Sequence, residues 1–128
     1  MPKQEIRSAN SAHPMGAYSQ GIRAGDFIYI TGTAPVNPET GTITATTVAE
    51  QTEQVINNIE SVLEAAGASL SDVVKSTVHL LDTATFAEYN EVYESMFPSP
   101  YPVRTTVGSD MRQVPNMLVE IDCVAYTG

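Results

Sequence analysis

The sequence has little of what stabilises a secreted domain or inserts a chain into a bilayer. It contains a single cysteine, Cys123, which cannot form a disulfide within the chain, and this favours a reducing compartment. No apolar run approaches the roughly 20 residues needed to span a bilayer, and the N-terminus lacks the basic and apolar regions of a signal peptide. We therefore expect a cytoplasmic protein that does not act in or on a membrane.

Basic residues are also scarce. Six Lys and Arg stand against 15 Asp and Glu, which gives a net charge of −9 at pH 7. A field of this sign repels phosphate backbones and anionic lipid, so nucleic acid is a poor candidate partner. The same field opposes anionic substrates, and a carboxylate ligand therefore needs a cation close to its binding site.

The usual signatures of nucleotide, metal and redox sites are missing. The chain has no GxxxxGK or GxGxxG motif, no HExxH and no CxxC. Its two histidines, His13 and His79, lie far apart with no cysteine near either, so no metal site is expected. His79, beside Leu80 and Leu81, is typical of a partly buried structural histidine. Ser, His and Asp all occur, but without the sequence of a nucleophile elbow.

What the chain does contain fits one globular domain over residues 1–128. It is 42% hydrophobic and 16% charged, and a chain of 128 residues forms a core without disulfides. No repeat, low-complexity tract or linker divides it.

Hydrophobic periodicity predicts the order β-β-β-α-β-α-β-β and hence an α+β layer with two helices on one sheet. Thr47 and Glu50 predict a capping box before a helix that ends near Gly67, and Thr85 and Glu88 predict a second box. The second helix carries an apolar stripe made of Phe86, Tyr89, Val92, Tyr93, Met96 and Phe97. The strands are expected near Ile6 and over residues 18–22, 26–34, 74–80, 103–109 and 118–125.

Two helices cover only one face of such a sheet. In the strand over residues 26–34, Phe27, Tyr29 and Thr31 alternate with Ile28, Ile30 and Gly32, so both of its faces are largely apolar. An uncovered apolar face usually marks a surface of association. The pattern therefore predicts a homo-oligomer.

Charged residues interrupt the last two predicted strands. Arg104 follows Val103, and Glu120 lies within Leu118–Ile121; alternation places Arg104 on the face of Thr106, and Glu120 on the face of Asp122 and Tyr126. One interpretation is a pair of exposed edge residues or a structural ion pair. The other is a site in which the guanidinium holds a carboxylate and the carboxylate of Glu120 activates a water. Strand context alone leaves both open.

Six sequence blocks occur in a characteristic order along nearly the whole chain. They are GAYSQG at 16–21, TGTAPVNPETG at 31–41, LEAAG at 63–67, FAEYN at 86–90, PVRTTV at 102–107 and LVEI at 118–121. In this combination they resemble the RidA/YjgF family of imine and enamine deaminases.

The resemblance implies a chorismate-mutase-like α+β fold, with a six-stranded mixed sheet, assembled as a homotrimer with active sites between neighbouring subunits. It also implies that Arg104 grips the substrate carboxylate and that Glu120 positions the attacking water. Five further positions match residues that line the cleft in the family: Tyr18, Thr31, Gly32, Asn90 and Thr106. The implied reaction needs no cofactor and converts 2-imino or enamine acids, such as 2-aminoacrylate and 2-iminobutanoate, to 2-keto acids and ammonia.

The sequence departs from the family pattern at two places near the expected cleft. Thr106 stands where many members have a cysteine, and the connection over residues 109–115 is one residue longer than usual; both affect substrate choice more than reaction type. Two other functions stay open. Some relatives are described as endoribonucleases or translation inhibitors, which the acidic charge opposes, and a non-catalytic ligand-binding regulator or holdase-like trimer would need Arg104 but not Glu120.

Overall fold

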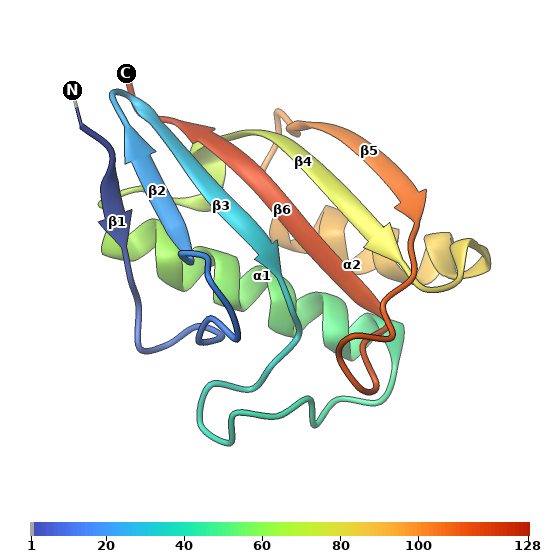
Figure 1. Cartoon of the computed structure of the whole chain (residues 1–128). Helices are drawn as coiled ribbons and strands as arrows, with labels where there is room; N and C mark the ends of the chain where they lie inside the picture. Colours follow the sequence, from blue (N-terminus) through green and yellow to red (C-terminus); the bar gives the residue numbers. More distant parts are fainter. Residues whose placement is uncertain (1) are drawn as a thin grey trace.

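The structure, a computed structural model, describes residues 2–128 as a six-stranded sheet with two α-helices (Figure 1). The element order is the predicted one. The strands are β1 (Gln4–Ile6), β2 (Gly21–Ala24), β3 (Phe27–Thr33), β4 (Val73–Leu80), β5 (Val103–Gly108) and β6 (Val119–Tyr126). The helices are α1 (Val48–Ala65) and α2 (Phe86–Met96), each adjoined by a short 3₁₀ turn, η1 (Leu70–Asp72) and η2 (Thr83–Thr85). Within residues 2–128 neither helix is both long and apolar enough to cross a membrane.

The sheet is mixed, with the strand order β1-β2-β3-β6-β4-β5. All neighbouring strands are antiparallel except β4 and β5. These two are parallel because α2 carries the chain back across the sheet between them, as a crossover connection must. The expected α+β architecture is confirmed.

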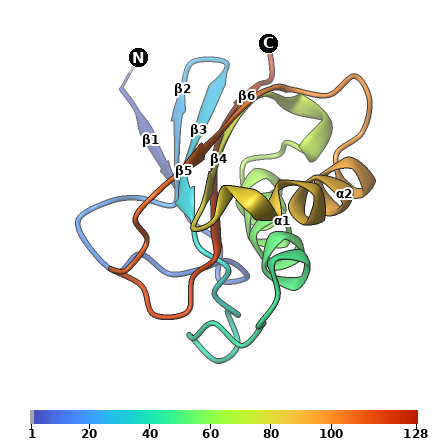
Figure 2. The same cartoon turned by 90° about the vertical axis from the view of Figure 1, so that its right-hand side faces the viewer.

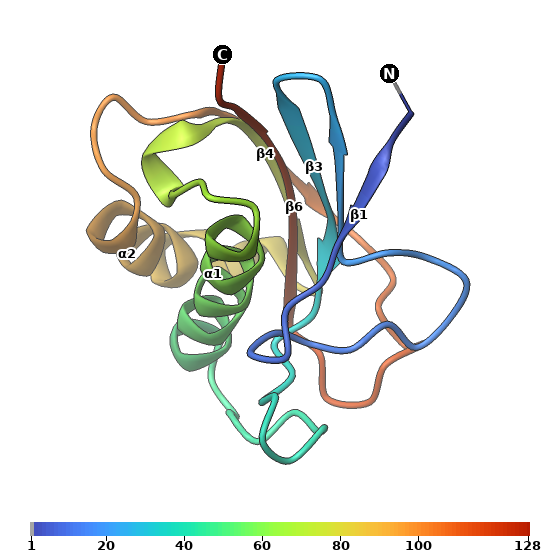
Figure 3. The same ribbon diagram turned by 90° about the vertical axis from the view of Figure 1, so that its left-hand side faces the viewer.

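Both helices lie on the same side of the sheet, as the two side views show (Figures 2 and 3). The segments between β1 and β2 and between β5 and β6 project from the opposite side. We call that uncovered side of the sheet the open face. It carries large apolar side chains that are more than a third exposed, namely Phe27, Tyr29, Val103, Val107 and Tyr126.

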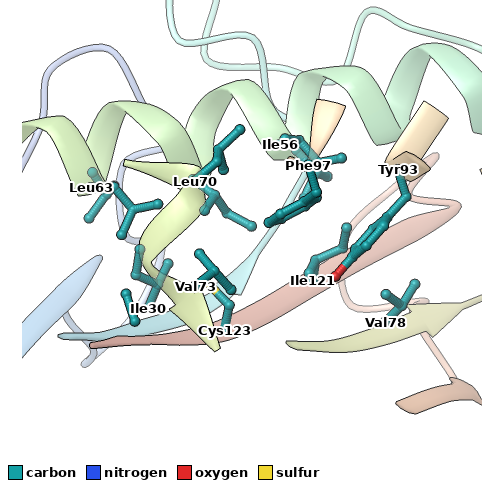
Figure 4. Packing of buried hydrophobic residues seen from close by; sticks show 14 of the residues in the cluster. Ile30, Ile56, Leu63, Leu70, Val73, Val78, Tyr93, Phe97, Ile121 and Cys123 are labelled. Atoms are coloured by element: carbon teal, nitrogen blue, oxygen red, sulfur yellow. The ribbon is translucent and has the colours of Figure 1, made fainter. Parts of the chain in front are cut away.

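The main core lies between the sheet and the helices (Figure 4). Ile30 and Ile121 of the sheet face Ile56 of α1 and Tyr93 of α2, and burial of each such side chain contributes about 1.5–3 kcal/mol. Cys123 belongs to the same core, where burial raises the pKa of its thiol to about 12. It is therefore an unreactive packing residue.

The two predicted capping boxes have different outcomes. The Thr47 hydroxyl accepts a hydrogen bond from the Glu50 amide at 3.2 Å and donates one to Glu50 Oε1 at 3.0 Å, so Thr47 is the N-cap of α1 as predicted. The box itself is only half formed, because within residues 2–128 the Glu50 side chain accepts from the Thr47 hydroxyl and not from the Thr47 backbone amide. The second box is wrong. The Thr85 hydroxyl donates to the carbonyl of Asp82 at 2.7 Å instead, because Asp82 caps the turn η2, which leads directly into α2.

Two strand predictions also need correction. Strand β2 begins at Gly21, and Tyr18 lies in the preceding loop, where its hydroxyl accepts a hydrogen bond from the Met15 amide at 3.1 Å. Val74 does not share the buried face of Val78, because the pairing of β4 with β6 shifts register between Val73 and Lys75. Val73 is buried in its place.

Two buried carboxamides of α1 hold the loops at one end of the sheet. Asn58 donates to the carbonyls of Ala34 at 3.1 Å and Val36 at 2.9 Å. Gln51 donates to the carbonyl of Asn116 at 2.8 Å and accepts from the amide of Leu118 at 2.8 Å. Helix α1 therefore fixes both the segment after β3 and the end of the loop before β6.

Candidate active site

Arg104 lies on the edge strand β5 and points toward α2. Its guanidinium carbon lies 4.7 Å from the ring centre of Tyr93, 5.2 Å from that of Tyr89 and 5.4 Å from that of Phe86. Its Nη1 donates a hydrogen bond to Asn90 Oδ1 at 2.9 Å. These four partners recur at helical spacing, so they lie on one face of α2 and together surround the guanidinium on that side. The three rings add cation–π attraction.

Hydrogen bonds hold two of these rings in place. The Tyr93 hydroxyl is bonded to Ser76 Oγ at 2.7 Å, and the Tyr89 hydroxyl is bonded to the Thr106 hydroxyl. Thr106 therefore lies on the same side of β5 as Arg104, as alternation predicted, but its hydroxyl is engaged by a tyrosine.

The guanidinium opens onto a hollow of about 390 Å³ lined by Asn90, Tyr93, Glu94, Tyr101, Pro102 and Arg104. Among residues 2–128, Arg104 has no carboxylate partner, and Asn90 is its one hydrogen-bond partner. The remaining donors of the planar guanidinium are those that match a carboxylate bidentately. This arrangement can hold an anion.

Glu120 lies on β6, on the open face. It borders a hollow of about 430 Å³, which is lined by Met15, Tyr18, Thr31, Gly32, Ala34, Gln113, Val114 and Glu120. In the described part of the chain its carboxylate has no hydrogen-bond donor and no ion-pair partner within reach. Burial raises the pKa of Glu120, the imidazole of His79 lowers it and the charge of Asp122 raises it. The carboxylate is free to accept a proton from a water in the hollow.

Gly32 lies directly against this carboxylate. A Cβ built on Gly32 would come within 2.5 Å of Glu120 Oε1 and 3.0 Å of its Cδ. Alternation predicted Gly32 on the buried side with Ile30, and this prediction is wrong. The register of β3 against β6 shifts between Ile30 and Thr33, so Thr33 takes the buried position and Gly32 turns toward Glu120.

The seven predicted site residues fall into two groups. Arg104, Asn90 and Thr106 lie together between the sheet and α2, and Tyr18, Thr31, Gly32 and Glu120 lie together on the open face. Within one chain the sheet separates the two groups. A single chain thus presents two half-sites, which we call the arginine half-site and the glutamate half-site.

Sequence reasoning missed two parts of this arrangement. The helical pattern predicts the rings around Arg104 only as a stripe that packs on the sheet. The signal that links these rings to Arg104 is the combination of three aromatic residues on one helix face with an arginine inside a strand. The second part is the environment of His79, which is bonded to Ser109 Oγ at 2.9 Å and to Asp122 Oδ2 at 3.1 Å.

From Pro2 to Gly128 no three His, Cys, Asp or Glu side chains gather as a metal site requires.

Comparison with known proteins places this geometry in a family. The family model described as Endoribonuclease L-PSP matches residues 8–127. A RutC family protein from Pyrococcus abyssi is 44% identical over 98% of both chains. Reactive Intermediate Deaminase A from Arabidopsis thaliana is 40% identical over 96% of this chain and 66% of its own length. A 2-iminobutanoate/2-iminopropanoate deaminase from Dermatophagoides farinae is 33% identical over 96% of this chain and 95% of its own.

Solved structures agree in fold over nearly the whole chain. RidA from Psychrobacter is 37% identical with a TM-score of 0.90, covering 96% of this chain and 98% of its own. TdcF of E. coli with bound serine is 31% identical with a TM-score of 0.90, covering 98% of this chain and 99% of its own. The fold and these relatives together show that the chain belongs to the RidA/YjgF family, which includes proteins named as deaminases of reactive imines.

Proposed function

We propose that the protein is a hydrolytic deaminase that converts small 2-imino or enamine acids, such as 2-aminoacrylate and 2-iminobutanoate, to 2-keto acids and ammonia. The observation that carries this proposal is the state of Arg104. Its guanidinium is fixed by Asn90 and three aromatic rings at the edge of a hollow, and it has no carboxylate partner among the described residues. We expect a partly buried cation held in this way to bind an anionic ligand.

The active unit in this proposal is a homotrimer in the cytoplasm. The open face is apolar where Phe27, Tyr29 and Tyr126 lie, and a second copy packed against it would cover that surface. The same packing would bring the arginine half-site of one subunit to the glutamate half-site of its neighbour. A complete site then requires two copies of the chain, because the sheet separates Arg104 from Glu120 within each copy.

The chemistry follows from the two half-sites. Arg104 would hold the substrate carboxylate bidentately and so fix the position of C2. A water beside Glu120 would add its oxygen to C2 as the carboxylate of Glu120 takes a proton from it. Glu120 would then pass that proton to the nitrogen. As the tetrahedral intermediate collapses, the C–N bond breaks and the new hydroxyl gives its remaining proton to Glu120, which leaves the keto group; the released ammonia carries that proton away as ammonium. A protonated imine is already electrophilic, so this sequence uses no cofactor.

The names of the relatives support this reaction. The mite relative is named as a deaminase of 2-iminobutanoate and 2-iminopropanoate, and the E. coli neighbour was solved with serine, which carries the carboxylate that the arginine half-site would hold.

The direct test generates the substrate in place. Threonine dehydratase produces 2-iminobutanoate from threonine, and semicarbazide traps the imine as it forms. We expect the protein to lower the yield of semicarbazone and to speed the release of 2-ketobutanoate. Equal trapping with and without the protein would exclude the activity for this substrate.

Subunit mixing tests whether the site is shared. Arg104→Lys and Glu120→Gln chains are each expected to be inactive, and after random co-assembly of equal amounts about one quarter of all subunit interfaces would combine an intact Arg104 with an intact Glu120 from different chains. We therefore expect the whole mixture to regain about a quarter of wild-type activity, and trimers that contain both kinds of chain about a third. No recovery in confirmed hybrids would show that both groups act from the same subunit, and light scattering near 13.7 kDa would exclude the oligomer.

The name of the matching family, Endoribonuclease L-PSP, favours a second candidate, RNA cleavage. A trimer would carry about −27, three times the −9 of one chain, and lacks the net positive charge that RNA binding uses. We expect no RNA degradation by highly purified protein. Nuclease activity that co-purifies with the protein and disappears in Arg104→Ala would establish this candidate. Ligand binding without turnover would instead indicate a regulator or holdase.

A further inference from the structure

His79 is the central member of a hydrogen-bonded row on the open face. Its Nδ1 is bonded to Ser109 Oγ at 2.9 Å and its Nε2 to Asp122 Oδ2 at 3.1 Å. Both ring nitrogens are therefore occupied, and the plane of the imidazole is fixed from two sides. The side chain of His79 is 27% exposed and that of Asp122 is 40% exposed. The pair is therefore partly solvated and not buried.

The register of the sheet brings this row beside Glu120. His79 of β4 is directly opposite Glu120 of β6, and Asp122 is two residues further along the same face of β6. Side chains directly opposite one another on neighbouring strands have Cβ atoms about 4.5–5.5 Å apart, so the side chains of His79 and Glu120 start from neighbouring positions on the same face of the sheet.

We infer that His79 is a positioning residue for Glu120, and that its fixed imidazole confines the carboxylate to the side of the hollow formed by Gly32. This inference deepens the proposed function and rests on it. Gly32 leaves the space into which the carboxylate fits, and His79 occupies the position paired with Glu120 on the neighbouring strand. The carboxylate is left facing the hollow lined by Tyr18 and Gln113.

Electrostatics supports the same role. Burial raises the pKa of Glu120 and so favours the protonated form, which cannot accept a proton from water. The imidazole of His79 lowers that pKa, whereas the negative charge of Asp122 raises it. The two neighbours therefore act on Glu120 in opposite directions.

No other charged group faces Glu120 from the surrounding elements in residues 2–128. Strand β3 contributes Thr31 and Gly32, and the loop before β6 contributes Gln113 and Val114. Strand β5 places Val107 beside His79. Tyr18, across the hollow, is the remaining titratable side chain there.

The grouping of Ser109, His79 and Asp122 has the residue types of a hydrolytic triad, but the hollows of the described chain do not support that function. Ser109, His79 and Asp122 line neither the hollow at Glu120 nor the hollow at Arg104. We assign Ser109 the role of holding the ring of His79.

The test uses the assembled protein and two variants with opposite expectations. His79→Gln can keep hydrogen bonds to Ser109 and Asp122 but removes the imidazole that lowers the pKa of Glu120, so the acidic limb of the kcat/KM profile should move to higher pH. Asp122→Asn removes the like charge, and the limb should move to lower pH. Lys75→Gln is the matched control, because it removes one positive charge from the same strand four residues away; its limb should coincide with that of the wild type.

A titration of the Glu120 carboxyl gives a readout that does not depend on turnover. In protein labelled with ¹³C at the glutamate side-chain carboxyl, the Glu120 signal is identified by its loss in Glu120→Gln. Its midpoint should move up in His79→Gln and down in Asp122→Asn. If both midpoints and both acidic limbs coincide with those of the wild type in correctly assembled variants, the inference is wrong. If the wild type shows no imine hydrolysis but the midpoints move as expected, the proposed reaction fails and the role of His79 stands.

Discussion

Gly32 and Glu120 share one space on the open face: the Glu120 carboxylate occupies the volume that a side chain at position 32 would need. A Cβ on Gly32 would approach Oε1 to 2.5 Å, which is closer than real Cβ contacts. The glycine is therefore required by the position of the carboxylate and not by the conformation of a turn. Gly32 and Glu120 can each be substituted separately.

We expect Gly32→Ala to lower kcat/KM by about tenfold or more, because the added methyl must push the carboxylate away from the water it holds. In a Glu120→Gln background the same substitution should have little further effect, since contacting residues are not additive. Gly16→Ala is the control, because a Cβ there meets the Tyr18 ring only at 3.6 Å. Equal losses in both backgrounds would separate Gly32 from Glu120.

Arg104→Lys should lower kcat/KM by about 100-fold or more although the charge is kept. An ammonium group lacks the planar fork that holds a carboxylate bidentately, and it cannot make the same stacked contact with Tyr93. Arg7→Lys is the matched control at an exposed arginine that pairs with Glu5. The measurement is 2-iminobutanoate hydrolysis, with assembly checked by light scattering. Near-wild-type activity in a correctly assembled Arg104→Lys protein would remove Arg104 from the site.

Glu120→Gln should lower kcat by about 10²- to 10⁴-fold, the usual contribution of a general base, while binding of a carboxylate ligand survives. The amide keeps the shape of the side chain but cannot take a proton from water. Calorimetry with a 2-keto acid product measures the binding that remains. A loss of less than about threefold would mean that another group activates the water.

Stability should respond to the same substitution in a manner that depends on pH. Burial raises the pKa of Glu120 in the folded protein, so the stability that its protonated form contributes is complete below the unfolded pKa and is lost as pH rises through the folded pKa. Gln mimics the neutral form. Glu120→Gln should therefore raise the Tm relative to wild type at about pH 7–8, and this gain should shrink toward about pH 4. A gain that is constant with pH, or larger in acid, would contradict this.

The sequence predicted the elements of the fold well because each depends on local rules. Thr47 and Glu50 lie next to one another at the start of α1, and the alternation of Val119, Ile121 and Cys123 fixes the faces of β6. The errors arose where a neighbouring element decided the outcome. Asp82 took over the cap predicted for Thr85, and register shifts moved Val74 and Gly32 to faces that alternation alone does not assign.

The candidate site was predictable residue by residue but not as an arrangement. Alternation assigned Arg104 to the face of Thr106 and Glu120 to the face of Asp122, yet it has no information on which face of each strand the helices cover. The pairing of His79 with Glu120 is a long-range register that depends on β4 and β6 being neighbours in the sheet. The rings of Tyr89 and Tyr93 reach Arg104 only because α2 crosses beside β5.

Gln51 anchors the end of the loop before β6 and so allows the exposed part of that loop to vary in sequence. Its carboxamide, completely buried in α1, binds the carbonyl of Asn116 and the amide of Leu118, so the entry into β6 is fixed from inside the core. The loop residues that reach the glutamate half-site, Gln113 and Val114, precede this anchor. Earlier in the loop Ser109 holds the ring of His79 and Met111 is buried. The exposed stretch around Gln113 is therefore the place where residues can be exchanged, and the lining of the glutamate half-site varied, without moving Glu120.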